Sequence, residues 1–317
     1  MSAIAFLFPG QGSQSVGMGR DLAARYAVAR EVFDQADAAL GFKLSELCFE
    51  GPEEKLKLTE NTQPAILTVS VAACRVLRES GVTPAFAAGH SLGEYSAHVA
   101  AGTLGFEDAV RTVSRRGRYM QEAVPVGQGA MAAILGMPLA ELSKVCGEAA
   151  QGEVCSPANI NSPEQIVISG STRAVERAAE LAKKRGAKRA ILLPVSAPFH
   201  CSLLQPAQDK MAGDLAQLSF CTMQIPVVCN VDARLVATPE AARDALIRQV
   251  TGAVRWEPCM HHLIAHGVET FVEVGPGKVL CGLMRQIDRH KNCLNVEDEA
   301  SLQKTLQQIS AAKTGAA

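Results

Sequence analysis

Residues 85–102 (AFAAGHSLGEYSAHVAAG) constrain the fold more strongly than any other stretch of the chain. A short apolar strand leads directly into a helix that ends at Gly102, and two glycines flank a serine in the pattern Gly-x-Ser-x-Gly. A turn this tight needs small flanking residues, and it presents the serine at the carboxyl edge of a sheet. The stretch therefore predicts an α/β fold in which Ser91 is a nucleophile. The alternative is a packing turn made of small residues.

The chain follows the same order of strand and helix before residue 126 and after residue 195. An apolar strand over 3–8 meets a glycine-rich turn, and a helix over 64–80 precedes Gly81. Further strands are expected in the stretches IPVVCNV and ETFVEVG. Because buried strands that alternate with helices form parallel sheets, the sequence predicts a parallel α/β domain. The small-residue tail AAKTGAA is predicted to be disordered.

Residues 126–195 show a different order of elements. Strands are predicted in GAMAAILG, EVCSPANI, EQIVISGS and KRAILLPV, and helices in LAELSKVCGEAA and RAVERAAELAKKRGA. The resulting order βαββαβ is typical of the ferredoxin-like unit, which is compact enough to be inserted into another domain. We therefore expect an insert over 126–195, within a catalytic domain formed by 1–125 and 196–317.

Charge and cysteine content narrow the possible partners and compartments. The net charge of the 317 residues is −1, so nothing global favours nucleic acid or an anionic membrane. No apolar run approaches the roughly 20 residues of a transmembrane helix. The ten cysteines are scattered without a C-x-x-C pair, and the N-terminus carries no signal-peptide pattern. We expect a cytoplasmic protein with reduced thiols.

A nucleophilic serine needs a base, and the chain contains seven histidines. His200 lies in VSAPFHC, a proline-containing loop just after a predicted strand, where catalytic residues are often displayed. His90 is adjacent to the serine, but neighbouring side chains diverge on a sharp turn. His98 lies two helical turns further on. The sequence therefore predicts His200 as the base, with a histidine packed at the domain junction as the alternative.

Acyl transfer also needs hydrogen-bond donors for the tetrahedral oxyanion. The amide of Leu92, directly after the serine, is one predicted donor. The amide of Gln11, in the turn PGQGSQ after the first strand, is the second. A dinucleotide site is not favoured in this turn, because Ser15 stands where the third glycine of the pattern would be.

No tightly bound cofactor and no metal are expected. The chain lacks the G-x-x-x-x-G-K-[ST] pattern of a phosphate-binding loop. His262 and His266 are four residues apart, with Cys259 one turn before them, which resembles the spacing of metal ligands. However, the glutamate of an H-E-x-x-H motif is missing and no fourth ligand is evident.

Six stretches together resemble one enzyme family. They occur in the order FPGQGSQ, TQPAILT, GHSLGEYSA, RRGRYMQ, PVSAPFHC and EVGPGKVL, and they extend from residue 6 to about residue 280. This set is similar to the malonyl-CoA:acyl carrier protein transacylases of bacterial fatty-acid synthesis. The resemblance implies an α/β-hydrolase-like large domain with a ferredoxin-like insert, and an acyltransferase that uses malonyl-CoA as substrate.

The resemblance also assigns roles to residues of this chain. It implies a Ser91–His200 dyad in which a backbone carbonyl near Gln249, rather than an aspartate, orients the histidine. It places the oxyanion donors at the backbone of Gln11 and Leu92. Many family members have serine where this chain has Phe199, a difference that concerns the selectivity of the pocket.

The resemblance further implies that Arg116 binds the malonyl carboxylate. This assignment is physically reasonable, because a buried carboxylate needs a partner and a planar guanidinium binds it through two hydrogen bonds. Arg115 and Arg118 are the neighbouring candidates, and we expect them to be solvated charges on a helix.

The expected partner is an acyl carrier protein, which is acidic and would need a basic surface on the enzyme. Two groups of basic residues could supply it: Lys183, Lys184, Arg185, Lys188 and Arg189, and separately Arg285 and Arg289. The alternative for the first group is a helix C-terminus stabilised by its dipole.

The implied reaction is a ping-pong transfer through a malonyl-serine ester. A serine hydrolase would share the nucleophile, but its usual residue order includes an acid that is not evident here. A non-catalytic protein that binds the carrier is the other alternative.

Overall fold

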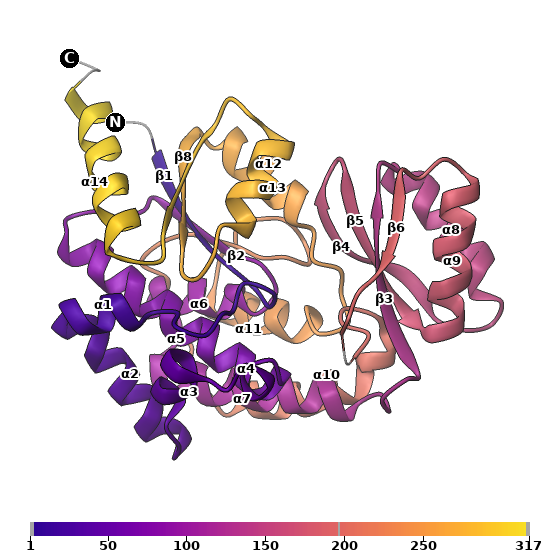
Figure 1. The fold of residues 1–317 in the computed structure, drawn as a ribbon, viewed down its shortest axis with the longest axis horizontal. Coiled ribbons are helices and arrows are strands. Elements are labelled where there is room, and N and C mark those ends of the chain that lie inside the picture. The colour runs from indigo at the N-terminus through magenta and orange to yellow at the C-terminus, as the bar shows by residue number, and fades with distance from the viewer. Residues whose placement is uncertain (1–2, 196, 315–317) are drawn as a thin grey trace.

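The computed structural model describes residues 3–195 and 197–314 and contains two sheets (Figure 1). The larger sheet is parallel and has the strand order β7-β2-β1-β8-β9. Its strands are β1 (Ala3–Phe8), β2 (Phe86–Gly89), β7 (Val227–Val228), β8 (Val268–Val274) and β9 (Asn292–Val296). Strand β1 is almost fully apolar, as expected for a central strand that is covered on both faces.

Helices from both halves of the chain surround the parallel sheet (Figure 1). Those before the insert are α1 (Arg20–Arg25), α2 (Ala27–Leu40), α3 (Leu44–Glu50), α4 (Glu53–Leu56), α5 (Thr59–Glu79), α6 (Gly93–Ala100) and α7 (Phe106–Glu122). Those after it are the 3₁₀ turn Ser202–Leu204, α10 (Gln205–Ala216), α11 (Pro239–Arg248), α12 (Trp256–Ala265), α13 (Val279–Ile287) and α14 (Glu299–Thr314). Two apolar cores, one on each face of the sheet, hold these layers together.

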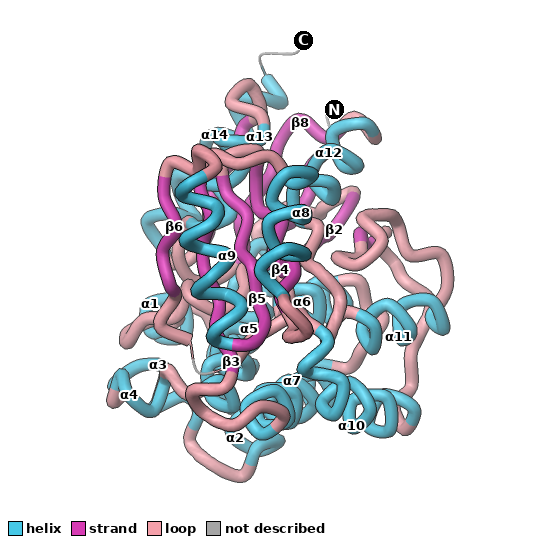
Figure 2. The backbone as a smooth tube through the Cα atoms, turned by 90° about the vertical axis from the view of Figure 1, so that its right-hand side faces the viewer, coloured by secondary structure: helices cyan, strands magenta, loops and turns pink. Residues whose placement is uncertain are grey.

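The smaller sheet is antiparallel and has the strand order β4-β5-β3-β6. It is formed by consecutive elements, β3 (Gly129–Leu135), α8 (Leu139–Ala150), β4 (Cys155–Ser162), β5 (Gln165–Ser171), α9 (Thr172–Lys184) and β6 (Arg189–Leu192). Helices α8 and α9 cover one face of this sheet (Figure 2) and enclose a separate apolar core. This segment is called the insert below.

The predicted α/β architecture with a parallel sheet is confirmed, and a second, antiparallel sheet is formed by residues between β2 and β7. Two details differ. The helix predicted from residue 64 begins at Thr59, so Pro64 lies within its second turn. The predicted disorder of the tail is wrong for residues 311–314, which continue α14, whereas residues 315–317 lie outside the described residues. Helix α14 is held by buried Leu302 and by a 3.0 Å hydrogen bond from Thr305 Oγ1 to the Asn295 carbonyl.

The fold brings the carboxyl ends of three adjacent strands together. Strand β2 lies between β1 and β7, and the register pairs Phe8 with Gly89. The loops that follow these strands carry Gln11, Ser91 and Asn230. Ligands of parallel sheets bind at this edge. Over residues 3–195 and 197–314, no helix combines the length and apolar character needed to span a bilayer.

Candidate active site

Ser91 lies in a strained turn between β2 and α6. Its φ is 52°, a left-handed conformation that a serine rarely adopts. A Cβ atom at Gly89 would overlap the backbone of Gly93, and one at Gly93 would overlap the carbonyl of Phe8. Both glycines are therefore required for the close approach of α6 to the strands, as the sequence pattern predicts.

His200 lies within hydrogen-bonding distance of the serine. Its Nε2 is 2.7 Å from Ser91 Oγ, and its Nδ1 is 2.9 Å from the backbone carbonyl of Gln249. A carbonyl can only accept, so Nδ1 carries the proton and Nε2 is free to accept the serine proton. The two other candidate histidines do not contact the serine hydroxyl, since His90 Nε2 contacts Asn161 and, among the described residues, neither buried His98 nitrogen has a hydrogen-bond partner.

The environment keeps His200 neutral. Burial lowers the pKa of His200 to about 3, and the nearby positive charge of Arg116 contributes to the lowering. The imidazole is therefore unprotonated at neutral pH and can act as a base without first losing a proton.

Arg116 is buried beside the dyad and has neutral hydrogen-bond partners. Only 1% of it is exposed. One terminal nitrogen donates to Gln63 Oε1 at 2.8 Å, and the other donates to Gln249 Oε1 at 2.9 Å and to Ser91 Oγ at 3.2 Å. Among the described residues, no carboxylate forms an ion pair with this guanidinium. Such a buried cation is an open site for an anion, because charges in protein interiors are normally paired.

The two neighbouring arginines lie on the outer side of α7. Arg115 is 51% exposed and lies 3.5 Å from Asp214, and Arg118 is 53% exposed and lies 3.8 Å from Glu122. The expectation that they are solvated charges agrees with this geometry. Helix periodicity explains the difference, since of these three positions only 116 lies on the buried side of α7.

The predicted oxyanion donors are the backbone N–H groups of Gln11 and Leu92. Gln11 and Leu92 both line the pocket that contains Ser91. In the described part of the chain, neither backbone N–H donates a hydrogen bond to another protein group. The Gln11 side chain is fixed by a 3.3 Å hydrogen bond to Thr59 Oγ1. Two unused N–H groups near a nucleophile are what an oxyanion requires.

Sequence reasoning missed two residues behind the serine, Asn230 and Glu94. Asn230 accepts from the Ser91 N–H at 2.8 Å and donates to the Gly89 carbonyl at 2.7 Å, so it holds both sides of the turn. Glu94 accepts from the Asn230 N–H and from the Gln249 side chain. Glu94 was recognisable as a charged residue in an otherwise apolar helix turn, whereas Asn230 carries no signal beyond its place after a strand.

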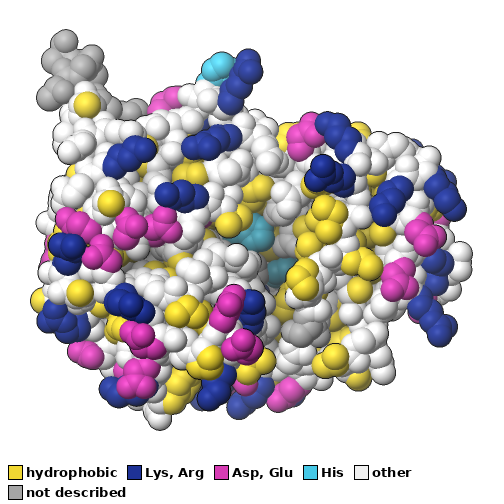
Figure 3. Space-filling view, in the orientation of Figure 1, with side chains coloured by type: hydrophobic (Ala, Val, Ile, Leu, Met, Phe, Trp, Pro, Cys, Tyr) yellow, Lys and Arg dark blue, Asp and Glu magenta, His cyan; other side chains and the backbone are white. Residues whose placement is uncertain are grey.

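The pocket around these residues has a volume of 480 Å³. Figure 3 shows it as a hollow between the large part of the molecule and the insert, with histidine side chains visible inside. The insert contributes Met131 and Asn159 to the lining, and the segment after β6 contributes Leu193, Pro194 and Val195. Phe199 also lines the pocket and packs against an apolar cluster that includes Met131.

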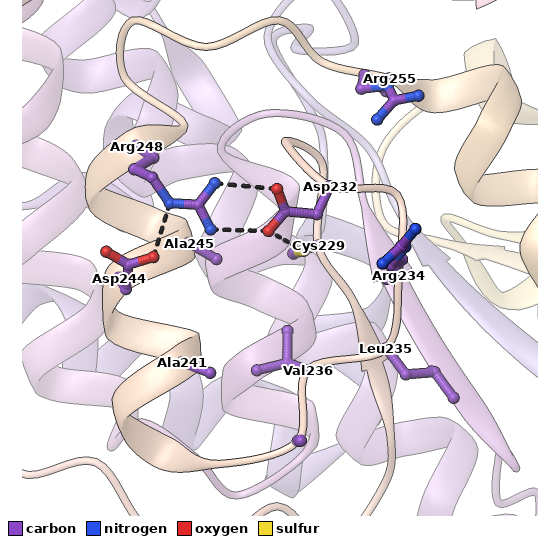
Figure 4. A pocket seen from close by; sticks show the side chains of 11 residues that line it. Cys229, Asp232, Arg234, Leu235, Val236, Ala241, Asp244, Ala245, Arg248 and Arg255 are labelled. Carbon is purple, nitrogen blue, oxygen red and sulfur yellow. Dashed lines mark hydrogen bonds and ion pairs between the residues drawn. The ribbon is translucent and has the colours of Figure 1, made fainter.

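A second pocket of 440 Å³ lies behind the site (Figure 4). It contains none of the predicted site residues. Its walls are the loop 229–236 and α11, and Arg248 binds Asp232 across it with two hydrogen bonds of 3.0 and 2.7 Å. Asn230 and Gln249 lie next to these walls, and both form hydrogen bonds to the backbone of Ser91. This pocket therefore borders residues that position the serine.

The two histidines with the spacing of metal ligands contact each other. His262 and His266 have ring centroids 4.4 Å apart, and His266 Nδ1 contacts the His262 carbonyl at 2.8 Å. Within residues 3–195 and 197–314, no group of three or more potential ligands has the geometry of a metal site.

Comparison with known proteins identifies the family. The model of the acyl transferase domain matches residues 5–312. The malonyl CoA-acyl carrier protein transacylase of Escherichia coli strain K12 is 54% identical over 288 residues, which is 90% of this chain and 93% of that protein.

Solved structures give the same answer. An acyl carrier protein S-malonyltransferase from Vibrio cholerae is 51% identical, with a TM-score of 0.94 over 96% of this chain and 100% of that chain. A malonyl-transacylase in complex with a type II polyketide acyl-carrier protein is 47% identical, with a TM-score of 0.95 over 97% and 100%. The chain is an acyltransferase that belongs to the acyl transferase domain family and, within it, to the malonyl CoA-acyl carrier protein transacylases.

Proposed function

We propose that this protein transfers the malonyl group of malonyl-CoA to the phosphopantetheine thiol of acyl carrier protein through a malonyl-serine intermediate. The observation that carries this proposal is Arg116, a buried guanidinium that has no carboxylate partner among the described residues and has a nitrogen 3.2 Å from Ser91 Oγ. A malonyl group has a carboxylate one methylene group away from the carbonyl that the serine would attack. The pocket therefore matches both ends of this acyl group.

In the first half-reaction, the malonyl carboxylate pairs with Arg116 and the thioester carbonyl lies against Ser91. His200 accepts the hydroxyl proton at Nε2 while Ser91 Oγ attacks the carbonyl carbon. The N–H groups of Gln11 and Leu92 stabilise the oxyanion. When the C–S bond breaks, the CoA sulfur takes the proton from His200, and the malonyl group remains on the serine as an ester.

The second half-reaction reverses these steps with a different thiol. His200 accepts the proton of the phosphopantetheine thiol, and the sulfur attacks the malonyl-serine carbonyl. Ser91 leaves and recovers its proton from His200. The Gln249 carbonyl stabilises the protonated imidazole in both halves through Nδ1, which is the function that an aspartate has in many serine enzymes.

The negative charge of a bound malonyl group would also make His200 a stronger base. In the empty pocket the positive charge of Arg116 helps to lower the pKa of His200. A bound carboxylate neutralises this charge, so the pKa of His200 rises when the pocket holds a malonyl group. A malonyl group would thus be favoured by binding and by a more basic His200.

The finer architecture belongs to the same proposal. We assign residues 1–125 and 196–317 to an α/β-hydrolase-like catalytic domain and residues 126–195 to a ferredoxin-like insert. The order βαββαβ and the sheet order β4-β5-β3-β6 support the second assignment. No tightly bound cofactor enters the proposed reaction. Cytoplasmic localisation stays a prediction from the sequence.

The proposed function is tested by intact-mass measurement in two steps. Mixing the protein with malonyl-CoA should add one malonyl group. Subsequent addition of holo acyl carrier protein should move this group to the carrier faster than water removes it. Rapid loss to water without transfer would instead identify a serine hydrolase, and the absence of any adduct would favour a non-catalytic protein.

Replacing His200 by alanine should slow acylation about 100-fold. We expect the lower end of the usual range for a general base, because a base with a strongly lowered pKa is weak until substrate binds. Stopped-flow measurement of CoA release would give the rate. The matched control is His98→Ala, which removes a buried imidazole with no hydrogen-bond partner in the described structure and should acylate at nearly the wild-type rate. Equal losses in the two variants would show that the effect is structural.

The carrier should dock on the basic residues of the insert, through Arg189. Arg185 and Lys188 form ion pairs with Glu148 and Glu164, whereas Arg189 is exposed and has no ion-pair partner among the described residues. Exposed Ile191 and Leu192 follow it on β6 and lead to the pocket lining. A positive charge beside apolar side chains suits an acidic partner with an apolar contact surface.

Arg189→Glu should therefore raise the KM for acyl carrier protein about threefold to tenfold and leave acylation by malonyl-CoA unchanged. The effect should shrink with added salt, since exposed charges are screened. Lys304→Glu makes the same charge change on α14, far from the insert (Figure 1), and should have no such effect. An equal loss in both half-reactions of Arg189→Glu would contradict docking at this surface.

A further inference from the structure

Glu94 is a buried carboxyl group directly behind the active site. It lies in the first turn of α6 and is completely buried. One oxygen, Oε2, accepts from the Asn230 N–H at 2.9 Å and from Gln249 Nε2 at 2.7 Å. The other oxygen, Oε1, has no hydrogen-bond partner in the described structure. A buried ionised carboxylate normally uses both oxygens, so Oε1 is a place where a proton can be held.

The Gln249 side chain connects Glu94 to Arg116. Its Nε2 donates to Glu94, and its Oε1 accepts from the Arg116 guanidinium at 2.9 Å. Glu94 and Arg116 therefore lie on opposite ends of one amide. The charges of Glu94 and Arg116 stabilise each other, because Arg116 acts to lower the pKa of Glu94 and Glu94 acts to raise the pKa of Arg116. Both effects favour the charged forms. In the empty pocket, Glu94 supplies the negative charge that Arg116 lacks in direct contact.

Among the charged groups around Glu94, Arg116 is its main electrostatic partner. Strands β1 and β2, which pack against α6, contain no titratable side chain. The titratable groups that interact electrostatically with Glu94 are Arg116 on α7, Cys229 and Asp232 on the loop after β7, Cys259 on α12 and Tyr95 on α6. His98 on α6 and Arg78, which reaches α6 from α5, are further titratable side chains on these elements.

Most of these neighbours are neutral or already paired. Burial raises the pKa of the two thiols and of Tyr95 and lowers that of His98, so all four are uncharged near neutral pH. Asp232 is bound by Arg248 (Figure 4). Arg78 donates to the Ala100 carbonyl, at the opposite end of α6.

Resting on the proposed function, we propose that Glu94 takes up a proton when a substrate carboxylate binds to Arg116, so that recognition of a malonyl group is coupled to protonation of this residue. The proton comes from solvent and forms an O–H bond at the unpartnered Oε1, while Oε2 keeps both hydrogen bonds. The site then exchanges one negative charge for another: the malonyl carboxylate replaces Glu94 as the anion that balances Arg116.

The coupling has a defined direction with pH. Burial raises the pKa of Glu94 to about 7 in the empty site. Below that pH Glu94 is already neutral, and Arg116 is free to bind a carboxylate. Above it the ionised Glu94 competes with the substrate for the same positive charge, and binding requires uptake of a proton. Preference for a malonyl over an acetyl group should therefore fall as pH rises above about 7.

The test measures kcat/KM for malonyl-CoA and acetyl-CoA in the acylation half-reaction between pH 6 and 9. The ratio of the two values cancels the titration of His200, because kcat/KM reports ionisations of the free enzyme, which is the same for both substrates. We expect this ratio to fall with pH above about 7, towards the limit of about tenfold per pH unit for uptake of one proton. Glu94→Gln keeps an acceptor oxygen for Asn230 and Gln249 but removes the charge, so its ratio should be independent of pH and higher than that of the wild type at pH 8.5.

Glu273→Gln is the matched control. Glu273 is also buried with a pKa raised to about 7, but it accepts from the Leu280 and Cys281 N–H groups on the far side of the sheet. This variant should keep the wild-type slope. A wild-type ratio that does not change with pH, or a slope that persists in Glu94→Gln, would overturn the proposal. Failure of the proposed function is distinct, since the wild type would then not acquire a malonyl group at any pH.

Calorimetry gives a second readout that does not depend on the folding of Glu94→Gln. Binding of malonyl-CoA to Ser91→Ala protein is measured at pH 8 in two buffers of different ionisation enthalpy. A difference that corresponds to uptake of up to one proton, which is absent with acetyl-CoA, supports the coupling. Equal proton exchange with both ligands would contradict it.

Discussion

Ser91→Ala should leave the protein folded and unable to acquire a malonyl group from malonyl-CoA. The substitution removes one hydroxyl from a turn whose backbone is fixed by groups that alanine keeps. Asn230 holds the N–H of residue 91, and Gly89 and Gly93 allow the close approach of α6 to the strands. The loss should be complete within detection, because an acyl-enzyme cannot form without a nucleophilic oxygen at this position. Intact-mass spectrometry after mixing with malonyl-CoA is the measurement.

Ser96→Ala is the control for this experiment. Ser96 lies on α6, directly after this turn, is fully buried, and its hydroxyl has no hydrogen-bond partner within the described parts of the chain. Its removal should leave the malonyl adduct intact. The competing nucleophile is Cys201, next to His200, but burial raises the pKa of its thiol and makes the reactive thiolate scarce. A malonyl adduct that persists in Ser91→Ala, on Cys201 or elsewhere, would show that the nucleophile has been misassigned.

The sequence predicts the parts of this site that depend on local geometry. A tight turn between a strand and a helix leaves few alternatives for residues 89–93, so the position of Ser91 could be derived without a structure. His200 was found in a similar way, from a loop that follows a strand. Periodicity also separates Arg116 from its exposed neighbours once the helix is known, although the sequence alone gives three adjacent candidates.

The sequence does not predict contacts that depend on how distant segments pack. Asn230 and Glu94 are 136 positions apart, yet they share a hydrogen bond behind the serine. The side chain of Gln249 joins four groups from three segments, whereas the family resemblance suggested only its carbonyl. A polar residue on an apolar helix turn raises the question of a partner, but only tertiary structure can identify that partner.

The tail shows the opposite limitation. Small residues at a chain end resemble a disordered segment, and the sequence offers no strong apolar pattern over AAKT. In the structure the helix continues through these positions because the preceding turns of α14 are anchored, with Leu302 and Ile309 buried against the rest of the domain. Helix formation propagates easily once a nucleus is fixed by packing, and this anchoring is not visible locally.

Arg116→Ala should strongly reduce the preference of the enzyme for malonyl over acetyl groups. We expect this change in selectivity to exceed that of any other substitution beside the Ser91–His200 dyad. Removing one partner of a buried charge pair costs about 3–5 kcal/mol, so kcat/KM for malonyl-CoA should fall by about 10²–10⁴-fold. Acetyl transfer should fall much less and could increase, for two reasons. A methyl group needs no charged partner, and loss of the guanidinium removes a positive charge that lowers the pKa of His200.

Arg115→Ala provides the control for Arg116→Ala. Arg115 is the adjacent arginine, but it is 51% exposed and lies beside Asp214 on the outer surface, so both substrates should react at nearly the wild-type rate. The measurement is kcat/KM for malonyl-CoA and acetyl-CoA on all three proteins, with thermal unfolding to verify that each is folded. Gln63 and Gln249 lose a hydrogen-bond donor in Arg116→Ala, and water can replace it in the enlarged pocket. A proportional loss for both substrates would show that Arg116 supports the structure of the site, and the group that selects a carboxylate would then have to be another one.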